Sequence, residues 1–154
     1  MNENTLTLVL PSPVSPGIAS AIYPVGGHLF LLDRVVRITG HMRHDPDSDA
    51  VDVIGEPASD RAAERWARSE IVCLALAARA EVLHEHPNAF RTHLSPVPPL
   101  VGWLIRLALS ERRPREADLL RTTLDASVAA IFSGDTGRAV NALGRLIAVI
   151  GTKE

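Results

Sequence analysis

The order of hydrophobic and polar positions divides the chain into three parts. In the first part, HLFLLDRVVRI (28–38) is rich in branched and aromatic residues, and AVDVIGE (50–56) alternates between apolar and polar positions. Both patterns are typical of β-strands, and the polar stretch between them predicts a hairpin. Four prolines and three glycines lie within 10–27, so we expect residues 1–27 to form an irregular lead-in.

A long helix is predicted over residues 61–86. Asp60 can cap its free N–H groups, and Pro87 stops it. Its middle, IVCLALAARAEVL (71–83), is apolar nearly all round. That pattern predicts a helix that is buried on several sides by other structure.

The C-terminal third fits two patterns. Apolar and polar positions alternate over 119–132, as in a half-buried strand, and SGDTG (133–137) supplies a reversal with two glycines. This favours a long hairpin preceded by a strand over 101–114, although the Ala and Leu content also permits two helices. We therefore expect one α+β domain over 1–154, in which C-terminal strands within 101–150 complete an antiparallel sheet curled around the long helix.

Composition and charge narrow the classes of function. The 154 residues include 16 basic and 18 acidic side chains, and a net charge of −2 argues against a nucleic-acid surface. A helix-turn-helix template around Ala129 offers only Arg138 and Arg145 in its recognition segment. No apolar run reaches the roughly 18–20 residues of a membrane span. The start, MNENTLTLVL, lacks the basic stretch of a secretory signal, and the single cysteine, Cys73, excludes an internal disulfide. A cytoplasmic protein with no membrane or nucleic-acid partner is expected.

Several motifs together resemble one family. GGHLFLLDRVVRI is similar to the opening strand of hotdog-fold 3-hydroxyacyl-ACP dehydratases, where ACP is the acyl carrier protein. Trp66, Glu70 and Leu74 stand where the aryl-polyene and polyene type II polyketide branch has Trp, Glu and Gln on its central helix. PPLVGWLIRL and RAVNALGRLIAVI are similar to later strands of that branch. The resemblance implies a hotdog fold, a curled antiparallel sheet wrapped around one long central helix.

The same resemblance implies an activity, the dehydration of a 3-hydroxyacyl or polyenyl thioester on an acyl carrier protein in fatty-acid or polyketide biosynthesis. Such a lyase needs an acid, a base and N–H donors for the thioester oxygen. Glu70 matches the helix carboxylate, and His28 is the candidate base. Glu70 can equally be a solvated residue near a helix start, and His28 a strand-end histidine with a local partner. The substrate-binding residues implied are Trp66, Leu74, Gly102 and Trp103.

Two positions depart from the family pattern. The chain has Val25 where the family has histidine, and Leu74 where it has glutamine. These departures leave two alternatives open. One is a non-catalytic hotdog subunit of a heterodimeric dehydratase, and the other is a hotdog module that binds acyl thioesters without catalysis.

The expected partners follow from the family and from charge. Arg112, Arg113 and Arg115 form a basic cluster that can steer an acidic acyl carrier protein, or else a solvated loop. The fold implies a homodimer or a heterodimer with another hotdog dehydratase subunit.

No cofactor is expected, because the phosphopantetheine arm arrives with the carrier protein, and no metal site is expected either. The acidic stretch from Asp45 to Glu56 imitates a calcium loop but has Ala50 where the sharp turn requires glycine.

Overall fold

The computed structural model describes residues 8–9, 13–31, 33–83 and 94–151. Within these residues the elements are β1 (Leu8–Val9), α1 (Pro16–Ile22), β2 (His28–Leu31), β3 (Arg34–Arg43), β4 (Val51–Pro57), α2 (Asp60–Leu83), α4 (Val97–Ser110), α5 (Pro114–Phe132) and α6 (Thr136–Gly151). The chain forms two compact units, Met1–Ala63 and Glu64–Glu154, and the boundary falls within α2.

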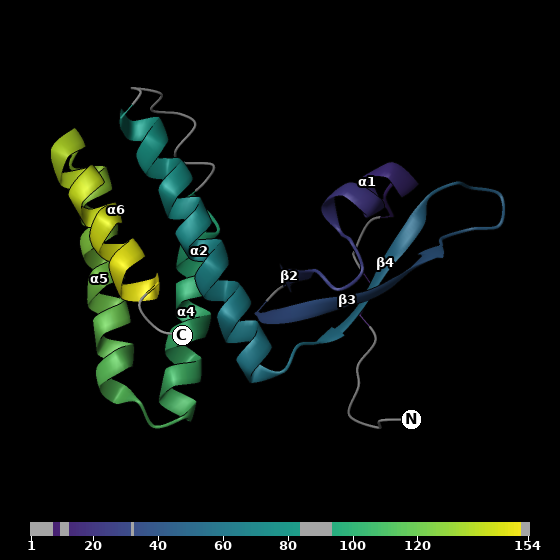
Figure 1. The fold of residues 1–154 in the computed structure, drawn as a ribbon, viewed down its shortest axis with the longest axis horizontal. Coiled ribbons are helices and arrows are strands. Elements are labelled where there is room, and N and C mark those ends of the chain that lie inside the picture. Colours follow the sequence, from purple (N-terminus) through teal and green to yellow (C-terminus); the bar gives the residue numbers. More distant parts are fainter. Residues whose placement is uncertain (1–7, 10–12, 32, 84–93, 152–154) are drawn as a thin grey trace. The chain divides into compact units, whose positions relative to one another are not determined.

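The first unit contains an antiparallel sheet with strand order β1-β4-β3-β2 (Figure 1). The expected hairpin is confirmed, because β3 and β4 pair from Val36↔Pro57 to Arg43↔Val51 with a register shift between Ile38 and Gly40. The strand predicted over 28–38 is instead two strands, since the chain turns at Asp33 and β2 folds back onto β3.

A short helix covers part of this sheet, where only an irregular lead-in was expected. Ser15 caps α1 by accepting a hydrogen bond from the Ile18 N–H at 3.3 Å, and Pro16 occupies its first turn. Ala19 of α1 is fully buried against Ile38 and Val53 of the sheet. This contact forms the hydrophobic core of the first unit.

The long helix α2 begins at Asp60, one residue before the predicted start at Arg61, and is described as far as Leu83. The last predicted positions, 84–86, lie outside the described residues. The prediction that this helix is buried on several sides is wrong. The helix α2 buries one stripe of residues at helical spacing and exposes Leu76 and Leu83 on the rest of its surface. The stripe consists of Ala63, Ala67, Ile71, Ala75 and Ala78.

The C-terminal third is helical, so the strands expected within 101–150 are wrong. The buried positions of α5 include Ala117, Leu120 and Ser127, and those of α6 are Ala139, Leu143, Leu146 and Ile150. These intervals of three, four and seven residues follow the helical period and not the period of two.

The hotdog fold expected from the sequence is therefore wrong. All strands in the described residues precede α2, and they form a sheet of three longer strands extended by the two-residue β1. The residues that would have supplied the larger sheet around the central helix are instead α4, α5 and α6. No described helix is both long enough and apolar enough to cross a membrane.

In the second unit, tight turns join the three C-terminal helices, which lie side by side (Figure 1). Arg112 takes a left-handed φ of 59° between α4 and α5, and Pro114 then opens α5. The predicted reversal at SGDTG is confirmed as a turn, with Gly134 at a φ of 76°, but it joins two helices. Asp135 starts α6 by accepting a hydrogen bond from the Arg138 N–H at 3.0 Å.

Candidate functional site

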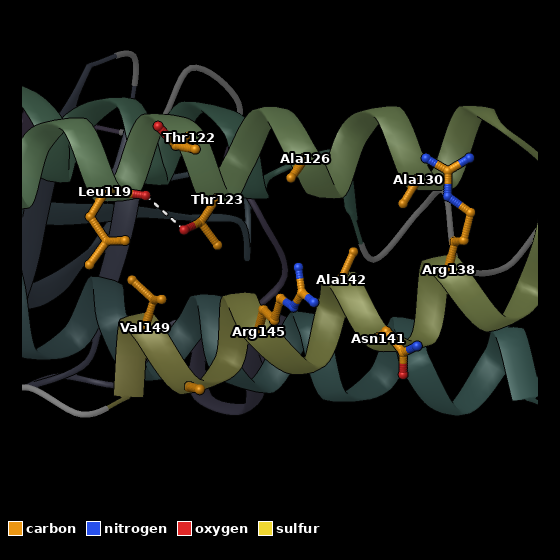
Figure 2. Close-up of a pocket in the computed structure, with 11 residues that line it drawn as sticks. Leu119, Thr122, Thr123, Ala126, Ala130, Arg138, Asn141, Ala142, Arg145 and Val149 are labelled. Carbon is orange, nitrogen blue, oxygen red and sulfur yellow. Dashed lines mark hydrogen bonds between the residues drawn. The ribbon is translucent and has the colours of Figure 1, made fainter.

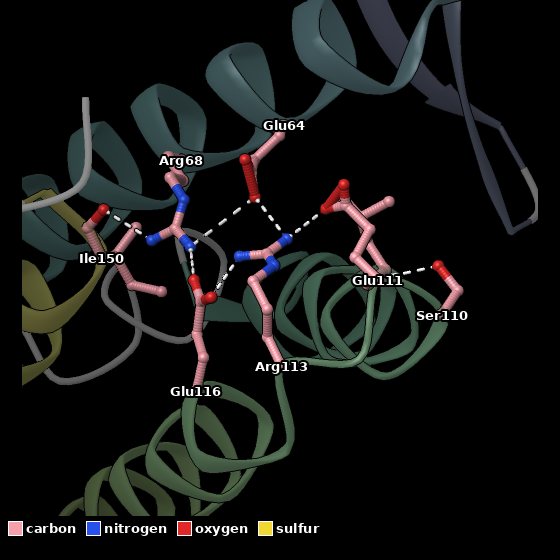
Figure 3. A network of polar contacts seen from close by, with 8 residues as sticks. Glu64, Arg68, Ser110, Glu111, Arg113, Glu116 and Ile150 are labelled. Atoms are coloured by element: carbon pink, nitrogen blue, oxygen red, sulfur yellow. Dashed lines mark hydrogen bonds and ion pairs between the residues drawn. The ribbon is translucent and has the colours of Figure 1, made fainter.

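A network of charged side chains in the second unit connects α2 with α5 and α6 (Figure 3). Arg68, only 6% exposed, donates to the Ile150 carbonyl oxygen at 2.9 Å and pairs with Glu116 at 2.5 Å. Arg113, just before α5, pairs with Glu116 and, at 3.3 Å, with Glu64 of α2. The network therefore ties three helices together through side chains that are largely shielded from water.

The charged groups of this network form ion pairs with one another. Arg113 also pairs with Glu111, so three carboxylates surround two guanidinium groups. Burial alone would lower the pKa of Arg113, but its hydrogen bonds with Glu111 and Glu116, and the charges of Glu116 and Glu64, outweigh burial and raise it above its ordinary value. Because both guanidinium groups are paired with carboxylates, the network is suited to holding the helices and leaves neither of its two cations free for a ligand.

A groove of about 570 Å³ lies between α5 and α6 of the same unit (Figure 2). Its lining is made of small, apolar and a few polar side chains, namely Leu119, Thr122, Thr123, Ala126 and Ala130 of α5 and Arg138, Asn141, Ala142, Arg145, Ala148 and Val149 of α6. Of these lining residues only Ala130 is buried, so the groove is shallow and open to water.

Two arginines of the groove distinguish it from an ordinary helix junction. Arg138 and Arg145 are seven residues apart on α6, which corresponds to about 10.5 Å along the helix axis. Figure 2 shows both side chains on the groove side of α6, with their guanidinium groups at separate points along it. In the part of the chain that the structure describes, neither guanidinium group forms a hydrogen bond or an ion pair. The groove is therefore an apolar surface that carries two cations for which the described residues supply no ion-pair partner.

The residues predicted to be catalytic lie in different units. His28 is half-buried on β2 of the first unit, opposite Arg37 of β3, and burial followed by the charge of Arg37 lowers its pKa. Glu70 is half-buried on α2 of the second unit and does not line the α5–α6 groove.

The residues predicted to bind substrate lie on two helices of the second unit. Trp66 and Leu74 lie one turn before and one turn after Glu70 on α2, so these three residues share one side of that helix. Gly102 and Trp103 lie on α4. None of these four residues lines the α5–α6 groove.

The predicted carrier-protein cluster is divided by the network. Arg113 is engaged with three carboxylates, whereas Arg112 is exposed at the turn between α4 and α5, and Arg115 is exposed in the first turn of α5. In the sequence, Arg138 and Arg145 stand out only as part of a weak match to a helix-turn-helix template. Their spacing of seven becomes informative once the segment is read as a helix, because it places both side chains on one face.

Metal ligands do not gather in the described residues, where no group of three or more His, Cys, Asp or Glu side chains is placed to hold an ion. The acidic stretch from Asp45 to Glu56 covers the loop of the β3–β4 hairpin and most of β4, and His44 of the loop pairs with Asp52 of β4 at 3.0 Å. No protein-family model, curated protein or solved structure matches this chain.

Proposed function

We propose that the second unit is a binding module whose α5–α6 groove receives an acidic amphipathic helix of a partner protein. The observation that carries this proposal is the pair of guanidinium groups of Arg138 and Arg145, which have no ion-pair partner among the described residues and lie over an apolar surface. Helices that dock in grooves present one apolar face to the groove, and charges along its edge set orientation and partner choice.

The depth of the groove favours a helix over a small molecule. Small-molecule sites bury most of their ligand, about 70–90% of its surface. This groove is lined mostly by exposed or half-exposed residues and has small side chains such as Ala126, Ala142 and Ala148 along it. Small side chains let another helix approach closely, whereas they enclose a free ligand poorly.

The spacing of the two arginines points in the same direction. Their separation of about 10.5 Å along α6 equals about two helical turns. One carboxylate or phosphate group is much smaller than this separation, but two carboxylates seven residues apart on a partner helix match it. The partner therefore carries Asp or Glu at positions i and i+7 beside its apolar face.

An acyl carrier protein, the partner predicted from the sequence, is acidic and is the first natural candidate to test. Dehydration of its 3-hydroxyacyl cargo stays a prediction that rests on the sequence motifs alone. The docking proposal requires no catalysis and is compatible with the alternative of a non-catalytic binding protein.

The proposal is tested with a designed helical peptide whose two glutamates are seven residues apart beside a stripe of alanine and leucine. Its affinity is measured by fluorescence anisotropy for the native protein and for the double variant Arg138→Gln/Arg145→Gln. We expect the double variant to bind at least about tenfold more weakly, equivalent to about 1.4 kcal/mol. Added salt should weaken only the native interaction, because exposed charges are screened.

Two controls make the result specific. Arg121→Gln removes an exposed arginine of α5 that pairs with Asp118 at 3.8 Å and does not line the groove, so it should leave the affinity unchanged. A peptide with its two glutamates on opposite faces should bind weakly to every variant. The absence of binding to the native protein, or equal binding to the double variant, contradicts the proposal.

A further inference from the structure

We infer, on the basis of the proposed function, that the acidic helix received by the α5–α6 groove is α5 of a second copy of this chain. The groove calls for a helix that carries carboxylates at positions i and i+7 beside an apolar face. Among the helices that the structure describes, α5 is the only one with two carboxylates seven positions apart, namely Asp118 and Asp125. The chain therefore contains both halves of the interaction.

Both carboxylates are open to a partner. Asp118 and Asp125 are exposed, and Asp125 has no ion-pair partner among the described residues. Asp118 lies 3.8 Å from Arg121, but both side chains are more than half exposed, and pairs of this kind contribute little to stability. The α5–α6 pair of helices thus presents two negative charges on α5 and the two positive charges of the groove on α6.

The two aspartates lie along the edge of an apolar face of α5. Residues three and four positions apart are neighbours on a helix, so Thr122 lies beside both Asp118 and Asp125. With 3.6 residues per turn, Leu119 and Ala126 lie on the other side of Thr122, where they line the groove (Figure 2). Leu119 is 52% exposed although it is apolar. The exposed face of α5 therefore has the pattern that the groove requires of a partner helix.

A two-fold axis parallel to these helices brings the opposite charges together. A tight turn joins α5 to α6, so the two helices run antiparallel (Figure 1). Rotation about such an axis places α5 of the second copy over the groove and turns its aspartate edge toward α6 of the first copy. Arg145 then faces Asp118 of the second copy, and Arg138 faces Asp125, because both spacings correspond to about 10.5 Å. Symmetry repeats the contact, which gives four arginine–aspartate pairs in the dimer.

Charge-swap variants of the full chain test the inference by sedimentation velocity. The native protein should form dimers at about 100 μM. Asp118→Arg/Asp125→Arg and Arg138→Asp/Arg145→Asp should each stay monomeric, because all four charges then have the same sign. A 1:1 mixture of the two variants should restore the dimer, because every arginine again faces an aspartate. A monomeric native protein, dimers of either variant alone, or a mixture that stays monomeric would overturn the inference.

A neutral variant measures the contribution of the aspartates without repulsion. Asp118→Asn/Asp125→Asn should weaken the dimer at least about tenfold. Asp47→Asn/Asp49→Asn removes the same charge from exposed positions of the β3–β4 loop and should leave the dimer unchanged. All of these positions are exposed, so the circular dichroism of each variant should match that of the native protein. Equal weakening by both neutral variants would contradict a contact through α5.

The same neutral variant separates this inference from the proposed function. Asp118→Asn/Asp125→Asn retains both arginines of the groove, so it should bind the designed glutamate peptide at least as tightly as the native protein does. A native protein that binds the peptide but stays monomeric would overturn the inference and leave the proposed function intact, with another acidic protein as the partner. A native protein that dimerises but does not bind the peptide would contradict the groove as a general site for acidic helices.

Discussion

A side chain at Gly55 of β4 would collide with β3. A Cβ atom built there lies 2.5 Å from Val36 Cγ1 and 2.7 Å from the Arg37 carbonyl oxygen. The second contact is with backbone, which cannot move without disturbing the β3–β4 pairing. We predict that Gly55→Ala lowers the free energy of unfolding by about 1–3 kcal/mol, measured by urea denaturation.

Gly40 of β3 supplies the control for this prediction. A Cβ atom at Gly40 meets nothing within 4 Å. Gly40→Ala should therefore change stability by less than about 0.5 kcal/mol. Equal effects of the two substitutions would show that the strands do not approach at Gly55 as described.

His28 makes stability depend on pH. Burial and then the charge of Arg37 lower its pKa below the ordinary value of 6.5, so below this pH the unfolded chain binds a proton more readily than the folded chain. The contribution is fully present above about pH 6.5 and is lost as the pH falls toward the folded-state pKa. We predict that His28→Gln reduces the loss of unfolding free energy between about pH 8 and pH 5. An unchanged pH profile would contradict this environment.

At the residue scale, the sequence indicates which side chains have suitable chemistry for binding. It does not indicate which of them are already paired with other residues in the fold. Arg113 belongs to a basic cluster in the sequence, yet Glu111 and Glu116 close by and Glu64, 49 positions earlier, neutralise it in the fold. Arg138 and Arg145 look unremarkable in the sequence, because the lack of an ion-pair partner for them among the described residues depends on which helices pack together.

At the scale of elements, Arg68 of α2 has the largest expected effect on stability. Its guanidinium group is buried and binds both the Ile150 carbonyl oxygen and Glu116. We predict that Arg68→Met lowers the free energy of unfolding by about 3–5 kcal/mol, because carboxylates are then left without their buried partner. Urea denaturation followed by circular dichroism measures the change.

Arg121→Met is the matched control, since its pair with Asp118 is exposed on both sides. An exposed pair of this kind contributes at most about 1 kcal/mol. If Arg68→Met were no more destabilising than Arg121→Met, the network would not hold α2 against α5 and α6.

The type of the C-terminal elements was ambiguous in the sequence for a specific reason. Leu120 and Leu124 of α5 fit a period of two and also a helical period, because their separation of four satisfies both. The burial of Ala117 and Ser127 resolves the ambiguity, since neither belongs to the apolar face of the strand pattern. Pro114, the last residue of the strand expected over 101–114, instead opens α5, because proline is favoured in the first turn of a helix.

At the scale of the whole molecule, local patterns predicted the hairpin of the first unit and the start of α2, because both depend on neighbouring residues. The hotdog architecture required strands within 101–150, so the error in that one segment changed the fold. The division into Met1–Ala63 and Glu64–Glu154 also depends on contacts between distant residues, which no local pattern contains.

The central claim is that the C-terminal third is a set of helices whose α5–α6 groove receives an acidic helix. Backbone-assigned NMR of the full chain, titrated with the glutamate-bearing peptide, tests it most directly. We predict helical Cα shifts over Pro114–Phe132 and Thr136–Gly151, with peptide-induced changes concentrated around Thr122, Ala126, Arg138 and Arg145. Strand-type shifts in these segments, or changes centred elsewhere, would contradict the claim.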